Sequence, residues 1–384
     1  MGHPVEVVGC LWADRHLSAS TIGDMARAWE SSGAVDALLL PDHLVNLIPP
    51  QLWTEENTPM AKLLKDPDSL SDVLVVAGYV LASAPKLGIS IGTDAVRRGP
   101  AEMAQAMLTI ANMAGGNAVF QFGAGENKQC KAYGHKRAEG LARMDEMLQI
   151  FRLFWDSKGK PFDFKGNKFT FEKATLGGAM PRRPTVFALG AGPKLLDYAT
   201  SYADGYGTVV PPVFHSPEVF AQARANLLEQ VERKGRDPKQ FRFATWFPVL
   251  LAEDDAMLER AIRNPLVRWY TAVFGRIQPE DWANVGLPNP MPEGWTYYKD
   301  LVPHNMPQEL VDMALSIVTD DHVRKGWVHG TADQCAKEIK KWIDAGADWV
   351  CPIDYMPVIL DPSEGAASLT RNIELCKAIK ASIT

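Results

Sequence analysis

The sequence predicts an α/β fold in which eight parallel strands, each followed by a helix, close into a (β/α)8 barrel. Short apolar runs rich in β-branched and aromatic residues alternate with amphipathic stretches from one end of the chain to the other. These runs are apolar on both faces, which is typical of strands covered by helices. A doubly wound open sheet with a second domain is the alternative, and eight strand–helix units favour the barrel.

The predicted strands lie at residues 5–12, 37–41, 87–92, 117–122, 184–190, 206–210, 243–251 and 347–353. Three of the helices between them have clear ends, because Ser, Thr or Pro is typical of a helix start and Gly of a helix end. These helices are predicted at 20–33, 100–114 and 333–345, where the chain has Ser20, Pro100 and Thr331 at the starts and Gly33, Gly115 and Gly346 at the ends.

Composition excludes several classes of protein. The 384 residues include 40 basic and 46 acidic side chains, a net charge of −6, whereas a nucleic-acid binder would normally carry a basic excess. The five cysteines form no C-x-x-C pair and H-E-x-x-H is absent, so neither a disulfide framework nor a metal site is expected. No signal peptide or long apolar segment is recognisable, so we expect a cytoplasmic protein without a membrane span.

One segment interrupts the alternation of strands and helices. Residues 264–325, after the seventh predicted strand, are rich in Pro, Trp and Tyr. The prolines exclude a long helix there, and the aromatic residues argue against disorder. We expect residues 1–384 to form one barrel domain with this segment as an insertion on the barrel mouth. The insertion is either packed on the rim or is a lid that lines an apolar substrate pocket.

Candidate functional residues follow the predicted strands, at the end of a barrel where active sites lie. Asp42 and His43 follow the second strand, and an imidazole that titrates near neutrality is a suitable proton donor. Glu126 follows the fourth strand in FGAGENKQC, where Gly123 and Gly125 permit a close approach of the backbone to a ligand. The alternative in each case is a turn with a purely structural role.

Two further turns have the residues of an anion site. In ALGAGPKLLDYA, residues 188–199, glycines precede a helix that starts at Pro193, and the N–H groups of such a helix bind anions. Arg97 and Arg98 follow the third strand and would contact a phosphate or carboxylate, unless they are a solvated surface pair. The G-x-S-x-G match at 88–92 suggests a serine hydrolase, but Ser90 lies inside a predicted strand rather than on a turn.

Five segments together resemble one known family. They are PDHLVNLIP at 41–49, TDAVRRGPAEMAQ at 93–105, FGAGE at 122–126, ALGAGPKLLDYATSYADGY at 188–206 and VHGTADQCAKEIKKWIDAGADWV at 328–350. With these segments the chain is similar to the luciferase-like monooxygenase superfamily, in its branch of coenzyme F420-dependent reductases and dehydrogenases, and above all to ketoreductases of that branch. The resemblance implies a TIM barrel, usually a homodimer, with a deazaflavin bound at the mouth.

The resemblance also implies an activity. The protein would transfer hydride between C5 of coenzyme F420 and a carbonyl carbon of an apolar small-molecule substrate. Val209 and Pro212 stand where enzymes acting on sugar phosphates carry Thr and Lys, which argues against a phosphorylated sugar. An FMN-dependent monooxygenase is the alternative with the same fold. A non-catalytic flavin- or deazaflavin-binding protein is an alternative of another class.

Residue roles carried over from the resemblance complete the expected site. His43 would be the proton donor, with Glu126 as the second candidate acid or base. Asp42 would hold the cofactor ring, and Ser90–Ile91 would form a non-proline cis peptide behind it. The ring would also contact Thr93, Ala124 and Gly125, with Gln129 in place of a frequent Asn. The cofactor phosphate would be held by Ala191, Gly192, Pro193, Lys194 and Leu195. The anionic tail of the cofactor would meet Arg97, Arg98, Lys128 and Lys131.

Overall fold

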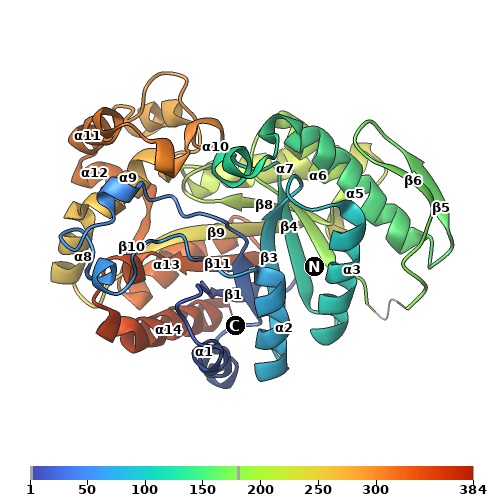
Figure 1. The fold of residues 1–384 in the computed structure, drawn as a ribbon, viewed down its shortest axis with the longest axis horizontal. Coiled ribbons are helices and arrows are strands. Elements are labelled where there is room, and N and C mark those ends of the chain that lie inside the picture. Colours follow the sequence, from blue (N-terminus) through green and yellow to red (C-terminus); the bar gives the residue numbers. More distant parts are fainter. Residues whose placement is uncertain (1–2, 180–181, 384) are drawn as a thin grey trace.

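Eight parallel strands close around the centre of the computed structural model, which describes residues 3–179 and 182–383 (Figure 1). Each strand pairs with the next in the barrel, and the last pairs with the first. In barrel order they are β1 (Glu6–Cys10), β2 (Ala37–Pro41), β3 (Gly88–Asp94), β4 (Ala118–Gly123), β7 (Thr185–Leu189), β8 (Gly205–Val209), β9 (Arg242–Leu251) and β11 (Trp349–Asp354). All eight predicted strands and the barrel itself are confirmed.

Helices surround the barrel, and the three whose ends were predicted are present. They are α1 (Ala19–Ser32), α3 (Pro100–Met113) and α13 (Ala332–Asp344). The other helices that cover the barrel are α2 (Val73–Ser83), α5 (Gly140–Asp156), α6 (Pro193–Tyr202), α7 (Pro217–Arg233) and α14 (Gly365–Ile383). None of the described helices is both long enough and apolar enough to cross a bilayer.

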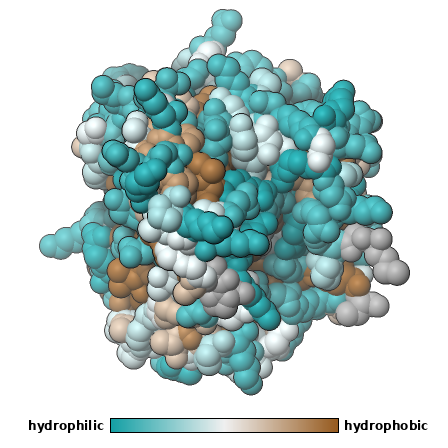
Figure 2. All heavy atoms as spheres, turned by 90° about the vertical axis from the view of Figure 1, so that its right-hand side faces the viewer, coloured by the Kyte–Doolittle hydropathy of each residue, from teal (hydrophilic) through white to brown (hydrophobic). Residues whose placement is uncertain are grey.

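Three strands were not predicted, two in a hairpin and one beside β9. The hairpin of β5 (Phe162–Lys165) and β6 (Thr170–Ala174) stands outside the barrel, and the Glu146 carboxylate on α5 accepts the backbone N–H groups of its turn. The short β10 (Val328–Gly330) pairs with the second half of β9. The face of the molecule on the side of this hairpin is mostly hydrophilic, with apolar side chains in small patches (Figure 2).

The segment after β9 is helical and lies on the opposite side of the barrel from the hairpin (Figure 1). It follows α8 (Asp255–Arg263) and contains α9 (Pro265–Phe274), α10 (Tyr297–Asp300), α11 (Gln308–Ile317) and α12 (Asp320–Gly326). None of these helices exceeds ten residues, as the prolines predict. An apolar cluster with Trp269, Tyr270, Leu301 and Val311 stabilises the segment and also contains Leu47 and Ile48 from the chain after β2.

The interior of the barrel is filled by side chains. Val8, Leu39, Val119, Phe187 and Trp349 belong to one buried cluster contributed by inward-facing strand positions. Larger apolar side chains on the outward-facing positions pack against the helices in a second cluster. Because the interior is packed, the space for a ligand lies at the carboxyl ends of the strands.

The turn after β4 depends on a glycine that begins α5. A Cβ at Gly140 would lie 1.7 Å from the carbonyl oxygen of Ala124, whereas a Cβ at Gly78 in α2 would find its nearest neighbour, the Met113 methyl group, at 4.0 Å. We expect Gly140→Ala to lower the free energy of unfolding by about 1–3 kcal/mol. Gly78→Ala should raise it by about 0.5–1 kcal/mol. Urea denaturation measures both, and equal effects would contradict this packing.

Candidate active site

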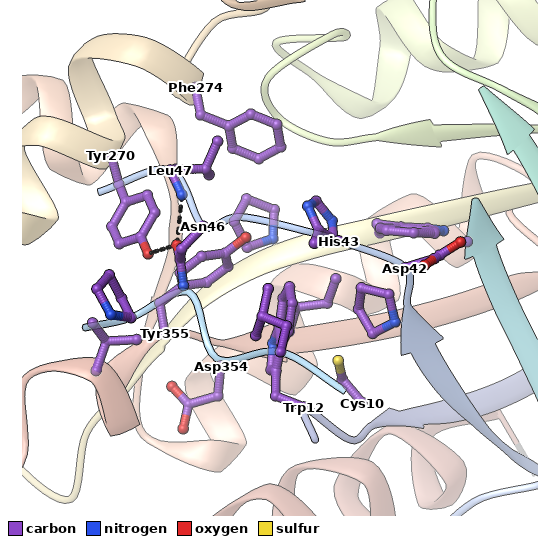
Figure 3. A pocket seen from close by; sticks show the side chains of 18 of the residues that line it. Cys10, Trp12, Asp42, His43, Asn46, Leu47, Tyr270, Phe274, Asp354 and Tyr355 are labelled. Atoms are coloured by element: carbon purple, nitrogen blue, oxygen red, sulfur yellow. Dashed lines mark hydrogen bonds between the residues drawn. The ribbon is translucent and has the colours of Figure 1, made fainter. Parts of the chain in front are cut away.

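A cavity of about 1520 Å³ opens at the carboxyl ends of the strands. Its walls include the turns after β2, β3, β4 and β7 and the helical insertion. Figure 3 shows side chains from the turn after β2 and from the insertion. Twelve residues predicted to belong to the site line it. They are Asp42, His43, Thr93, Ala124, Gly125, Glu126, Gln129, Ala191, Gly192, Pro193, Lys194 and Leu195.

Ser90 and Ile91, which were expected behind the cofactor ring, do not line the cavity. The cis peptide predicted between them is wrong, since Val210–Pro211 is the cis bond found among the described residues. Ser90 and Ile91 pair in register with both β2 and β4, and an extended trans backbone satisfies both ladders. Ile91 packs outward against the helices, and the buried Ser90 hydroxyl lies within the strand. The strained turn of a serine hydrolase is therefore not present at Ser90.

Asp42 is the centre of a buried charge cluster at the ends of β2 and β3. Its carboxylate accepts hydrogen bonds from the Thr93 hydroxyl at 2.7 Å and from Arg98, and Arg97 Nη2 lies 3.0 Å from Oδ2. Burial by itself would raise the pKa of Asp42, but the two guanidinium groups and the Thr93 hydrogen bond lower it below its usual value. Asp42 is therefore an anion at neutral pH, although its side chain is only 4% exposed.

Arg97 and Arg98, which the sequence suggested as contacts to a phosphate or carboxylate, do not line the cavity. Arg97 donates to the carboxylate of Asp94 and to the backbone oxygen of Asp42, and its side chain is 6% exposed. Arg98 binds Asp42 and, at 3.1 Å, Asp72. Carboxylates of the protein itself already occupy both guanidinium groups. The sequence did not reveal these ion pairs, because the spacing of Asp42, Asp72 and Asp94 does not show that their carboxylates lie beside the two arginines.

His43 lies over the mouth of the barrel, with its ring centroid 5.5 Å from that of Trp12 (Figure 3). Its Nδ1 atom is 2.6 Å from Lys128 Nζ and 2.8 Å from Gln129 Nε2. Its Nε2 atom has no hydrogen-bond partner in the described chain and belongs to a ring that lines the cavity. Burial, followed by the charges of Lys128 and Arg97, lowers the pKa of His43 well below its usual value. His43 is therefore neutral at physiological pH.

Glu126 connects the barrel to the insertion. Tyr297 on α10 donates its hydroxyl to Glu126 Oε1, and Glu126 Oε2 lies 3.3 Å from Lys128 Nζ. Burial, followed by the neighbouring Glu126 carboxylate, raises the pKa of Tyr297 well above its usual value, so the phenol remains a donor. Cavity-lining side chains from the barrel and from the insertion thus share one polar network.

The Gly-rich turn after β7 lies where an anion site was predicted. Gly190 and Gly192 have φ values of +140° and +98°, which side chains rarely allow. Gly192 precedes α6, which has no side-chain cap, and Ala191, Gly192 and Lys194 line the cavity. The first N–H groups of the helix are therefore available to an anionic ligand.

Trp246 on β9 was not singled out in the sequence, although it forms part of the cavity wall. Its indole Nε1 donates to Gln121 Oε1 at 2.9 Å. A Cβ at Gly92 would lie 2.3 Å from the Trp246 ring, so only glycine leaves room for it. Gly92 lies within β3 and Trp246 is distant from it in the chain, so no local pattern in the sequence indicates this contact.

The insertion supplies an apolar wall. Tyr270 and Phe274 on α9 lie beside the segment after β2, and the Tyr270 hydroxyl donates to Asn46 Oδ1 at 2.7 Å (Figure 3). Val209 and Val213 line the cavity after β8, near where the sequence predicts an apolar substrate. The cavity therefore combines one polar side with one aromatic and aliphatic side.

Comparison with known proteins adds to this geometry. A profile of the luciferase-like monooxygenase family matches residues 11–348. The chain belongs to this family. The resemblance found in the five sequence segments is thereby confirmed, and the closed barrel of parallel strands agrees with it.

Several known proteins are similar to this chain. A phthiodiolone/phenolphthiodiolone dimycocerosates ketoreductase from Mycobacterium sp. (strain JLS) is 28% identical over 318 residues, 81% of either chain. A putative coenzyme F420-dependent oxidoreductase from Mycobacterium tuberculosis is 28% identical over 263 residues, covering 62% of this chain and 74% of the relative. An F420-dependent secondary alcohol dehydrogenase with a bound F420–acetone adduct has a TM-score of 0.73 at 19% identity, covers 99% of both chains and shows the shared fold.

Removal of the charge at Asp42 tests the buried cluster. We expect Asp42→Asn to lower the free energy of unfolding by about 3–5 kcal/mol, because the two arginines lose a buried counter-ion. The matched control is Asp24→Asn in the exposed Asp24–Arg27 pair, whose side chains are 74% and 51% exposed. This change should cost less than about 1 kcal/mol.

The loss of stability caused by Asp42→Asn should depend on pH in a direction that follows from the lowered pKa of Asp42. A carboxylate with a lowered pKa contributes stability above its unfolded pKa and loses it as the pH falls through the folded value. The difference between wild type and Asp42→Asn should therefore persist at neutral pH and shrink only below about pH 3.9. Urea denaturation at several pH values measures it, and a difference that disappears near neutral pH would contradict the ion cluster.

Proposed function

We propose that the protein is a coenzyme F420-dependent oxidoreductase that reduces the carbonyl group of an apolar ketone. The observation that carries this proposal is the neutral His43 imidazole, whose Nδ1 is held by two donors while its other edge faces a large cavity. A proton donor in that place is what carbonyl reduction requires, since hydride addition leaves a negative charge on the oxygen.

The residues present fit the cofactor. Its phosphate would bind at the start of α6, where Ala191, Gly192, Lys194 and Leu195 line the cavity and no side chain caps the helix. Its ring would lie near Thr93, Ala124, Gly125 and Gln129, beside the Trp246 indole. The oxygens of Asp42 already accept three side-chain donors, so we assign Asp42 to shaping the wall of this site. When bound, coenzyme F420 supplies or accepts the hydride at its C5 atom.

The protein's own residues would orient the substrate and move a proton. His43 would donate from Nε2 to the carbonyl oxygen, and Glu126, which also lines the cavity, is the second candidate. Tyr270, Phe274, Val209 and Val213 would bind the apolar part of the substrate and exclude water. Ligand cavities usually measure about 300–1,000 Å³, so about 1520 Å³ leaves room for cofactor and substrate together.

An FMN-dependent monooxygenase would use the same fold, and titration with each cofactor separates the two proposals. We expect coenzyme F420 to bind with quenching of its fluorescence and its reduced form to be oxidised by ketones but not by oxygen. Tight FMN binding without F420 binding would contradict the proposal and favour the monooxygenase.

Two substitutions test the proton donors. We expect His43→Gln to lower the single-turnover rate of ketone reduction by about 10²–10⁴-fold, because general acid catalysis contributes that much. Glu126→Gln should have a smaller effect, since the amide keeps the partner of Tyr297. Stopped-flow oxidation of the reduced cofactor measures both, with cofactor binding as the control. Equal rates in both variants and wild type would show that neither His43 nor Glu126 is the proton donor. No turnover in wild type would favour a non-catalytic binding protein.

Two further properties belong to this proposal. The family resemblance supports a homodimer, which light scattering would measure. The cysteines of the described chain are free, and Cys130, Cys335, Cys351 and Cys376 are buried, which supports a location in the reducing cytoplasm.

A further inference from the structure

Lys128 is a buried charge to which the mechanism above gives no role. Its side chain is 0% exposed and it does not line the cavity, although the sequence predicted a cation at the mouth. Burial of a lysine costs free energy unless its charge is compensated. This buried lysine contacts Nδ1 of His43, the proposed proton donor, and this contact suggests a role for it in proton transfer.

Three acceptors surround the Lys128 amine. His43 Nδ1 lies at 2.6 Å, the backbone oxygen of Val45 at 3.2 Å and Glu126 Oε2 at 3.3 Å. An ammonium group has three N–H donors and no acceptor, so this environment matches the charged form. One of these donors points at the ring of His43.

The amide of Gln129 independently fixes the tautomer of His43. Gln129 Oε1 accepts the backbone N–H of Leu44 at 2.6 Å, so the other amide atom must be the nitrogen. This nitrogen is a donor, and it lies 2.8 Å from His43 Nδ1. Nδ1 is therefore an acceptor, and the proton of the neutral ring resides on Nε2, at the edge that has no partner in the described chain.

We propose that Lys128 is a positioning residue that stores the proton for carbonyl reduction and delivers it through His43. This inference rests on the proposed function. As the carbonyl carbon accepts hydride from the reduced cofactor, the His43 Nε2–H bond breaks and an O–H bond forms on the substrate. At the same time a Lys128 Nζ–H bond breaks and an Nδ1–H bond forms. His43 stays neutral throughout, and the positive charge leaves Lys128 as the substrate oxygen loses its negative charge.

This relay avoids an unfavourable intermediate. A neutral imidazole that gave up its proton alone would become an anion, whereas one that receives a proton at Nδ1 only changes tautomer. Alcohol oxidation would run the same steps in reverse, with Lys128 as the acceptor. Glu126, whose side chain is 28% exposed in the cavity, offers Lys128 a path for proton exchange with solvent.

The surrounding charges support the assignment. Burial lowers the pKa of Lys128, and this effect outweighs the Glu126 and Asp68 carboxylates, which raise it, while Arg97 lowers it further; the ammonium is thereby a better acid. Burial together with Lys128 and Arg97 lowers the pKa of His43, which excludes the imidazolium as the resting form. Tyr297 hydrogen-bonds Glu126 on the side away from Lys128. The acceptors around Lys128 and the donor amide of Gln129 thus match a protonated lysine beside a neutral histidine.

The resting state can be tested without cofactor or substrate. Nitrogen NMR of protein labelled at its eight histidines distinguishes the tautomers, and His43→Gln identifies the signal of His43. We expect neutral, Nε2-protonated His43 even at about pH 6, where an unperturbed histidine is largely charged. A His43 that titrates near 6.5, or that carries its proton on Nδ1, would overturn the proposal even if the protein proves to be an F420 enzyme.

The relay itself is tested by single-turnover ketone reduction. Lys128→Met should lower the rate constant at saturating substrate by about 100-fold or more, with KM little changed. The wild-type rate should fall as the pH rises through the lowered pKa of Lys128, and this fall should be absent in the variant. The control Lys136→Met removes an exposed lysine eight residues further on and should leave the rate unchanged.

Added amines separate a relay from a structural role. In Lys128→Ala, methylammonium should restore part of the lost rate, and the restored rate should fall with pH around the pKa of the added amine. A folded Lys128→Ala variant that binds cofactor but is not rescued, or a Lys128→Met variant with the wild-type pH profile, would overturn the relay. If neither variant folds, the NMR result on the wild-type protein still decides whether His43 has the required tautomer.

Discussion

The Asp42 carboxylate, neutralised between Arg97 and Arg98, is the interaction on which the site depends. It joins the end of β2 to the end of β3 through Thr93 and both guanidinium groups. The backbone of Asp42 is fixed as well, because its N–H donates to Gly92 at 2.8 Å and its oxygen accepts from Arg97 at 2.8 Å. The next residue in the chain is His43. A rigid attachment of this kind determines where the imidazole lies before any ligand arrives.

From His43 a series of buried polar contacts crosses from the barrel to the insertion. His43 contacts Lys128 and Gln129, Lys128 contacts Glu126, and Glu126 accepts the hydroxyl of Tyr297. Partly satisfied networks of buried polar groups are costly, so each member depends on the next. The insertion is therefore more than a cover for the barrel rim. It completes the electrostatic surroundings of the histidine and provides the apolar wall with Tyr270 and Phe274.

Local patterns in the sequence were enough to predict the strands, the helix starts and the residues at the ends of the strands. All eight barrel strands follow from apolar runs, and the uncapped helix start after β7 follows from glycines before Pro193. The placement of Asp42, His43 and Glu126 around one cavity follows from the rule that strand ends converge in a barrel.

What the sequence could not reveal depends on contacts between distant segments. The three aspartates that bind Arg97 and Arg98 come from separate turns, so the arginines looked free. Lys128 looked like a surface charge because nothing nearby in the sequence shows that Val45 and His43 cover it. The cis bond at Ser90–Ile91 was expected from resemblance alone, and the paired ladders of β3 hold it trans.

A crystal structure of the protein with bound coenzyme F420 tests the central claim most directly. The account predicts that the deazaflavin ring lies in the cavity with its reactive edge toward His43 and that its phosphate rests on the N-terminus of α6. A ring bound outside this cavity, or one whose reactive edge faces away from the imidazole, would contradict it.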